Sequence, residues 1–181
     1  MTARDEYSVS VYASPMPLPI PFFVHTYFVL THHDLQARYE LLGFETEHHS
    51  KRLHKLIFKD YLPPETGFNW LSTYLFPEIG PRYHVKKLHT IAGSTGSVAY
   101  ELFDFITSPR LFEYPGLDNY HMIQGPNSNL FTAWVLNQVS GCKFNLPKVR
   151  GVRITLSHKA LKAHHRKRPP AGPFAVQRRA L

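Results

Sequence analysis

The first third of the chain contains short runs of residues typical of β-strands, the first of which alternates between polar and apolar positions. Residues 7–12 alternate in this way and include two valines, so we predict a first strand there. Residues 22–30 are aromatic or β-branched almost throughout, which favours a central strand. Residues 38–45 are predicted as its hairpin partner. The polar, histidine-rich stretch 48–59 fits either a further strand or a loop.

Later segments change to the spacing of helices. A strand is predicted over residues 85–91, followed by a helix that begins within 94–97 and ends near Ile106. A short strand at 120–123 leads into a second helix, whose apolar residues after Asn129 recur at intervals of three and four. Together these elements predict an α+β fold in which an antiparallel sheet packs against helices.

Length and composition predict one globular domain with extensions. The chain has 181 residues, of which 43% are hydrophobic and 19% charged. We expect the main domain over residues 22–153, with the strand and Pro-rich segment of residues 1–21 belonging to it. The net charge of +8 is uneven, because no acidic residue follows Asp118. Residues 154–181 are therefore predicted to form a basic tail.

Two interpretations of this tail stay open. It is either a solvated segment that aids solubility, or it binds an anionic partner such as nucleic acid, a membrane surface or an acidic protein. Stacking on single-stranded nucleic acid is disfavoured, because Phe174 is the only aromatic residue there. The candidate contact residues are Lys159, Lys162, Arg166, Lys167 and Arg168.

The sequence gives no signal for a membrane span, a metal or a cofactor. The apolar stretch 11–24 is too short to cross a bilayer and contains four prolines. A single cysteine, Cys142, excludes an intrachain disulfide and allows a reducing compartment, so we expect a cytoplasmic protein. The histidines at 32–33 and 48–54 lack the convergent spacing of metal ligands, so no metal site is expected.

The segment Gly125–Phe131 (GPNSNLF) holds the strongest candidate for chemistry. Ser128 lies where a helix begins, near free backbone N–H groups and the positive end of the helix dipole, which are the parts of an oxyanion hole. The alternative is that Asn127 and Ser128 only cap the helix, with their side-chain oxygens accepting from the first turn. Asn129 completes the polar run and would support either role.

A serine nucleophile needs a base within hydrogen-bond reach, and histidine is the usual one. His25 is the best candidate, because it lies in an otherwise apolar strand. A satisfied core histidine is the alternative interpretation. Tyr39 and Glu40 follow in the next predicted strand, where they would either orient the base or form cross-strand pairs.

Several segments resemble the bacterial family known as domain of unknown function 3750. The resemblance covers about residues 20–150, and its most specific part is the Pro-Asn-Ser-Asn run at 126–129. This chain differs from the family pattern at Tyr27, where Trp is usual, and at Leu130, where Thr is usual. It also has Gly-Val-Arg at 151–153 instead of Gly-Lys-Asp. The segments that carry the resemblance are Phe23–Tyr27, Arg38–Gly43, Tyr120–Phe131 and Leu146–Pro147.

More distantly, the order of these segments is similar to circularly permuted papain-like hydrolases and acyltransferases of the NlpC type. Those proteins place a His-Thr strand first and an Asn-Cys-x-x-Phe helix start later. The resemblance implies a permuted papain-like fold, His25 as the base, Ser128 in the nucleophile position, and a substrate or peptide with an amide, ester or thioester bond. A serine hydroxyl has a far higher pKa than a thiol, so the helix dipole cannot ionise it. A non-catalytic binding or structural module on the same scaffold is therefore the alternative.

Overall fold

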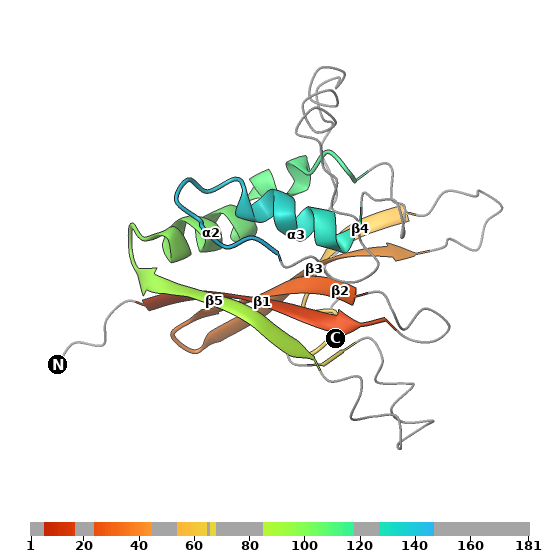
Figure 1. Cartoon of the computed structure of the whole chain (residues 1–181), viewed down its shortest axis with the longest axis horizontal. Coiled ribbons are helices and arrows are strands. Elements are labelled where there is room, and N and C mark those ends of the chain that lie inside the picture. Colours follow the sequence, from red (N-terminus) through yellow and green to blue (C-terminus); the bar gives the residue numbers. More distant parts are fainter. Residues whose placement is uncertain are drawn as a thin grey trace.

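The computed structural model describes residues 6–16, 24–44, 54–64, 66–67, 85–117 and 127–146. Its centre is a five-stranded antiparallel sheet with two α-helices on one side, which confirms the predicted α+β class (Figure 1). The circular permutation and the papain-like arrangement stay predictions. The elements in chain order are β1 Glu6–Pro15, β2 Val24–His32, β3 Leu35–Phe44, β4 His54–Lys59, β5 Lys86–Ser94, α2 Val98–Thr107, the 3-10 helix η2 Pro109–Glu113, and α3 Ser128–Leu136.

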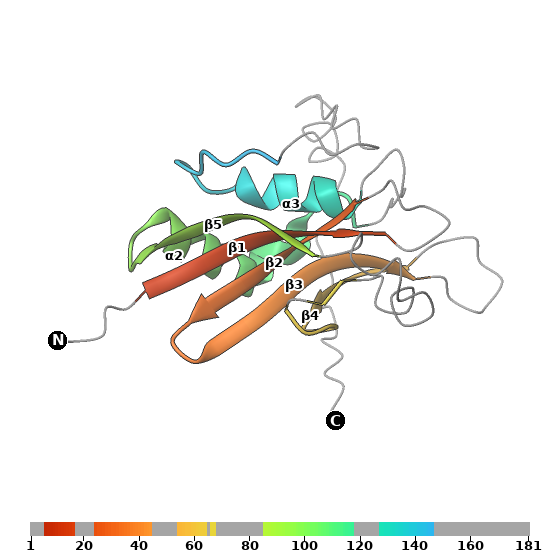
Figure 2. The same cartoon turned by 60° about the horizontal axis from the view of Figure 1, so that its bottom comes forward.

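The strand order is β4-β3-β2-β1-β5, and every neighbouring pair is antiparallel (Figure 2). The first four strands follow one another as a meander, and β5 then returns to the free side of β1. The alternative left open for residues 48–59 is answered in part by β4, which begins at His54. The predicted strand at 120–123 and the basic tail at 154–181 lie outside the described residues.

The two faces of the sheet have different neighbours, because successive side chains of a strand point to opposite sides. The helix face is the side that packs against α2 and α3. Helix α2 packs on β1 and β5, and α3 packs on β2 and β3. Apolar side chains of the sheet and both helices form one continuous core between these layers. Its fully buried members include Val9, Val11, Phe28, Leu30, Leu41, Leu102, Ile106, Phe131 and Val135.

The second face carries a smaller apolar cluster together with buried polar and charged groups. Tyr12, Tyr27 and Val29 form this cluster, and Val85 packs against it. Buried His25 and Arg38 belong to the same face, since they alternate with residues of the helix core along β2 and β3. The sheet therefore separates an ordinary hydrophobic core from a polar one.

The turn into α2 depends on one glycine. Ser97 caps the helix by accepting from the backbone N–H of Tyr100 at 3.3 Å. Gly93 lies directly against this cap, and a Cβ atom at that position would be 2.6 Å from the Ser97 hydroxyl oxygen. No side chain fits there, so the sheet and the start of α2 approach each other through this residue.

Candidate functional site

Helix α3 begins with the cap that the sequence predicts. Asn127 has an extended backbone (φ −139°, ψ −175°), and its side-chain oxygen accepts from the backbone N–H of Leu130 at 3.1 Å. The Asn127 carbonyl accepts the first helical hydrogen bond from Phe131 at 2.9 Å. The capping prediction is thus confirmed for Asn127. Ser128 is the first residue of the helix and does not serve as its cap.

A buried set of side chains fastens the start of α3 to β2. The Thr26 hydroxyl oxygen lies 2.9 Å from Asn129 Oδ1 and 2.9 Å from the Thr132 hydroxyl. Because Oδ1 only accepts, Thr26 donates its one proton to Asn129 and accepts from Thr132. Asn129 Nδ2 donates to the Val24 carbonyl at 2.8 Å. The Asn129 amide thus contacts β2 with both of its polar atoms.

Thr26 and Thr132 are parts of this fastening that sequence reasoning missed. Thr26 is polar in an apolar strand, and Thr132 lies one helical turn after Asn129, so both carried a signal. Each is fully buried. Thr26 is the neighbour of His25 in β2, and its side chain faces α3 and bonds to it.

Ser128 itself makes little use of its side chain. The residue is 4% exposed, and its backbone carbonyl lies 3.4 Å from the Thr26 hydroxyl. Among the described residues, its hydroxyl has no hydrogen-bond partner, and His25 is not within hydrogen-bond reach. The predicted nucleophile is held in place by its backbone and its neighbours.

His25 belongs to a buried charged network on the second face. Its Nε2 lies 3.0 Å from the Glu40 carboxylate, and the same carboxylate oxygen accepts from Arg38 Nη2 at 2.7 Å. The Arg38 guanidinium also stacks over the Tyr27 ring at 3.6 Å. Arg38 and Glu40 are fully buried, and His25 is 3% exposed. Glu40 therefore does orient His25, as a buried partner and not as a surface pair.

Burial and pairing set the charges of this network. Burial lowers the pKa of His25, and this effect exceeds the opposing effect of the Glu40 hydrogen bond. Burial alone would raise the pKa of Glu40, but the hydrogen bonds and charges of its two partners hold that pKa below its ordinary value. Glu40 is thus an anion beside the permanent Arg38 cation. In its neutral form His25 donates to Glu40 from Nε2, because a carboxylate only accepts.

The network also holds the chain that follows β4. Arg38 Nη1 donates to the carbonyl of Pro63 at 3.1 Å and to that of Thr66 at 2.5 Å. At the other end of the same residue, the backbone N–H donates to the Asp60 carboxylate at 2.7 Å. One buried arginine therefore joins β3 to the segment after β4, which is a structural task.

The predicted nucleophile and base lie on different sides of the sheet. Thr26 faces α3, the helix that begins at Ser128, so its neighbour His25 points to the opposite face. The stack of His25 with Tyr27, at 6.1 Å between ring centroids, places both rings on that second face. The structure therefore brings His25 together with Glu40, but it does not bring His25 together with Ser128.

Tyr39 also lies away from His25. It pairs with Phe28 across the strands and packs against the helix core. Burial, with a smaller contribution from the Asp60 charge, raises the pKa of its hydroxyl. Tyr39 is thus a neutral side chain of the helix face and does not support the base.

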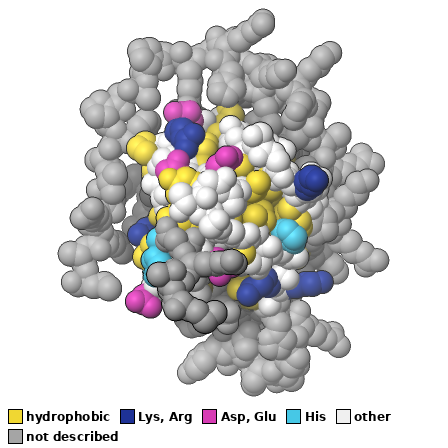
Figure 3. Space-filling view, turned by 90° about the vertical axis from the view of Figure 1, so that its left-hand side faces the viewer, with side chains coloured by type: hydrophobic (Ala, Val, Ile, Leu, Met, Phe, Trp, Pro, Cys, Tyr) yellow, Lys and Arg dark blue, Asp and Glu magenta, His cyan; other side chains and the backbone are white. Residues whose placement is uncertain are grey.

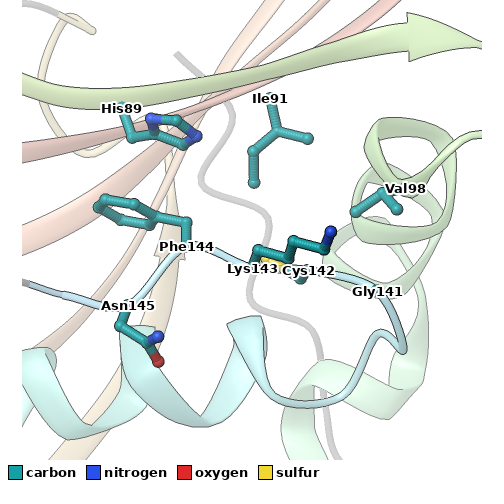
Figure 4. Close-up of a pocket in the computed structure, with 8 residues that line it drawn as sticks. All are labelled: His89, Ile91, Val98, Gly141, Cys142, Lys143, Phe144 and Asn145. Atoms are coloured by element: carbon teal, nitrogen blue, oxygen red, sulfur yellow. The ribbon is translucent and has the colours of Figure 1, made fainter.

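A separate hollow of about 360 Å³ lies between β5 and the segment that follows α3 (Figure 4). Cys142 is part of its wall. Among the described residues, no three His, Cys, Asp or Glu side chains gather as a metal site would require. No helix in the described ranges is long and apolar enough to span a bilayer.

Comparison with known proteins places the chain in a family without assigning it an activity. No curated protein and no solved structure matches it significantly. One family model matches residues 6–152, which cover the five strands and two α-helices of the described residues. The chain therefore belongs to the family described as "Protein of unknown function (DUF3750)".

Proposed function

We propose that this domain is a binding module and that the Asn127-Ser128-Asn129 segment has a structural role. The observation that carries the proposal is the separation of Ser128 and His25 by the sheet. Both asparagines have hydrogen-bond partners that hold α3 in place. His25 in turn bonds to a buried carboxylate. The groups that would orient or activate Ser128 are thus engaged in two separate structural tasks.

A hydrolase or acyltransferase is the competing function. It would need a proton acceptor close to the Ser128 hydroxyl. His25 would reach the helix face only if β2 shifted its register by one residue, which moves every side chain of a strand to the other side. Such a shift would also carry Phe28 and Leu30 out of the core, where both are fully buried. The geometry therefore favours binding over catalysis.

An anionic partner fits the charge distribution best. The described ranges contain equal numbers of acidic and basic residues, and Figure 3 shows both signs interspersed on one end of the molecule. After residue 146 the sequence has ten Lys or Arg and no acid. We therefore assign the attraction to the C-terminal segment, through Lys159, Lys162, Arg166, Lys167 and Arg168. A cytoplasmic location belongs to the same proposal.

Two measurements on the full chain test this function. Incubation with a fluorophosphonate should give no labelling that depends on Ser128, because in the described part of the chain no base lies within reach of its hydroxyl. Labelling that disappears in both Ser128→Ala and His25→Ala would overturn the proposal in favour of a hydrolase.

The second measurement is binding of a 20-base-pair DNA duplex and of poly-glutamate at two salt concentrations. If the five named tail residues each contact one charge of the duplex, raising the salt from 50 to 200 mM should weaken binding by about 10²- to 10³-fold. Replacing all five by glutamine should remove most of the affinity and most of this salt dependence. Equal binding by the parent chain and this variant would remove the tail from the proposal.

A further inference from the structure

Strand β5 is an outer strand of the sheet. In the described part of the chain it pairs with β1 alone, so one row of its backbone N–H and C=O groups points away from the sheet. Most of its residues are exposed or half-buried. An outer strand of this kind is a template to which another extended segment adds through backbone hydrogen bonds.

The protection of this edge against unwanted pairing covers only one half of β5. Lys86 and Lys87 lie at its beginning, and a bulge interrupts the pairing with β1 beside them. Charged residues and bulges are the features that usually prevent edge-to-edge association. Residues 90–94, in contrast, carry no charge and no proline. That half of the edge therefore lacks the charged residues, prolines and bulges that usually prevent another strand from pairing.

The hollow between β5 and the segment after α3 lies beside this edge. Its walls are largely apolar, with His89 and Ile91 from β5 on one side and Phe144 lying against His89 (Figure 4). The rings of His89 and Phe144 stack at 4.4 Å with an angle of 9° between their planes. Val98 of α2 closes one end, and Lys143 contributes the one charged group of the lining. The hollow has room for a large apolar side chain.

A strand that pairs with the edge of β5 would bring its side chains next to the hollow. A strand that adds to β5 directs every second side chain toward the helix face, where the hollow lies. Its neighbouring residues would meet Lys86, Lys87 and Lys143, whereas β5 itself carries no acidic residue. Acidic side chains in the added strand therefore complement the surface that surrounds the hollow.

We propose that the edge of β5 binds an extended acidic peptide of a partner protein. The peptide adds as a sixth strand, places one apolar side chain in the hollow lined by His89, Ile91 and Phe144, and directs its carboxylates to the three lysines. This inference rests on the proposed binding function and gives that function a second contact, separate from the basic tail.

The test uses the synthetic peptide Ac-EEVTFTVEE-NH2 and the full chain, labelled with nitrogen-15. Binding should shift the amide resonances of residues 86–94 and 141–145 and slow the hydrogen exchange of β5 amides. A peptide with lysine in place of every glutamate should bind at least about tenfold more weakly. Shifts confined to other residues, or equal binding of both peptides, would overturn the proposal.

Variants separate this site from general charge effects and from the tail. Lys86→Glu combined with Lys87→Glu should weaken the peptide by about tenfold or more, and Phe144→Ala should do the same without a change of charge. Lys59→Glu, on β4 at the opposite edge, is the matched control and should leave the affinity unchanged. The variant with five tail residues replaced by glutamine should still bind the peptide. Loss of binding in that variant alone would contradict the β5 site while leaving the tail function intact.

Discussion

Replacing Asn129 by alanine should destabilise the domain more than any other change in the Asn-Ser-Asn segment. The substitution removes the acceptor of the Thr26 hydroxyl and the donor to the Val24 carbonyl. Each hydrogen bond contributes about 1 kcal/mol, and a buried polar group left without its partner costs about 1–3 kcal/mol more. Thr26 retains Thr132 as a neighbour, which limits the second cost. We expect a loss of about 2–4 kcal/mol in the free energy of unfolding.

The two preceding residues provide matched comparisons. Asn127→Ala removes the capping bond to Leu130, and the loss of a cap costs about 1 kcal/mol. Ser128→Ala removes a hydroxyl that has no partner among the described residues, so its effect should stay within about 0.5 kcal/mol. Three neighbouring substitutions to the same residue are thus expected to rank Asn129, Asn127, Ser128 in decreasing cost.

Urea denaturation of the full chain and each variant, followed by far-ultraviolet circular dichroism, measures these differences. A double-mutant cycle of Thr26→Val with Asn129→Ala should give a coupling energy of about 0.5–3 kcal/mol, because the two side chains are in direct contact. Additive effects in that cycle would refute the fastening of α3 to β2. The same holds if Ser128→Ala is as costly as Asn129→Ala.

Three further predictions concern the second face and the turn into α2. The lowered pKa of His25 means that the unfolded chain takes up a proton that the folded domain excludes, so stability falls as the pH drops below the ordinary histidine pKa of 6.5. His25→Gln should flatten this fall by up to about 1.4 kcal/mol per pH unit in urea titrations. Arg38→Met leaves the buried Glu40 carboxylate without its cation and should cost about 3–5 kcal/mol, with partial recovery in Arg38→Met/Glu40→Leu, both read from the denaturation midpoint. Gly93→Ala should cost about 1–3 kcal/mol by calorimetry because its Cβ meets the Ser97 hydroxyl, and Ser97→Gly in the same chain should recover most of that loss.

The strands and helices were largely predictable because their local patterns agree with their final surroundings. β1 alternates between serine and valine, so its apolar side is clear even though both of its faces are buried in the fold, and α2 places its apolar residues on one side. The placement of His25 and Ser128 on different faces could not be predicted, for a reason of the same kind. β2 has apolar residues on both of its faces, with Phe28 on one and Tyr27 on the other. Its own pattern therefore does not say which face packs against the helices.

The neighbouring strand held the missing signal. In β1 the valines face the helices, and the serines and Tyr12 face the other side. Ser14 is the cross-strand partner of His25, and paired residues of an antiparallel sheet share a face. With the register between β1 and β2 in hand, the side of β1 that carries the serines assigns His25 to the second face. Register depends on the connection between the strands, which local periodicity does not encode.

The charged network could not be predicted from periodicity at all. Arg38 and Glu40 alternate with Tyr39 and Leu41, which normally indicates a strand with one solvated face. Both charges are instead fully buried, because each is the partner of the other and His25 completes the set. Burial of charge is tolerated only with such pairing. The alternation therefore indicates correctly which residues share a face of β3, but it does not indicate that this face is buried.

Ser128 is consequently the residue on which the choice of function depends most directly. Its two neighbours hold the fold together, so a loss of function in their variants would be difficult to separate from a loss of structure. Its own hydroxyl contributes little to the fold in the described part of the chain, so Ser128→Ala should remain as stable as the parent. If peptide binding, DNA binding and fluorophosphonate labelling are all unchanged in that variant, the hydroxyl has no role beyond its place in the helix. If one of them changes, stability cannot be the cause, and the change identifies what the hydroxyl does.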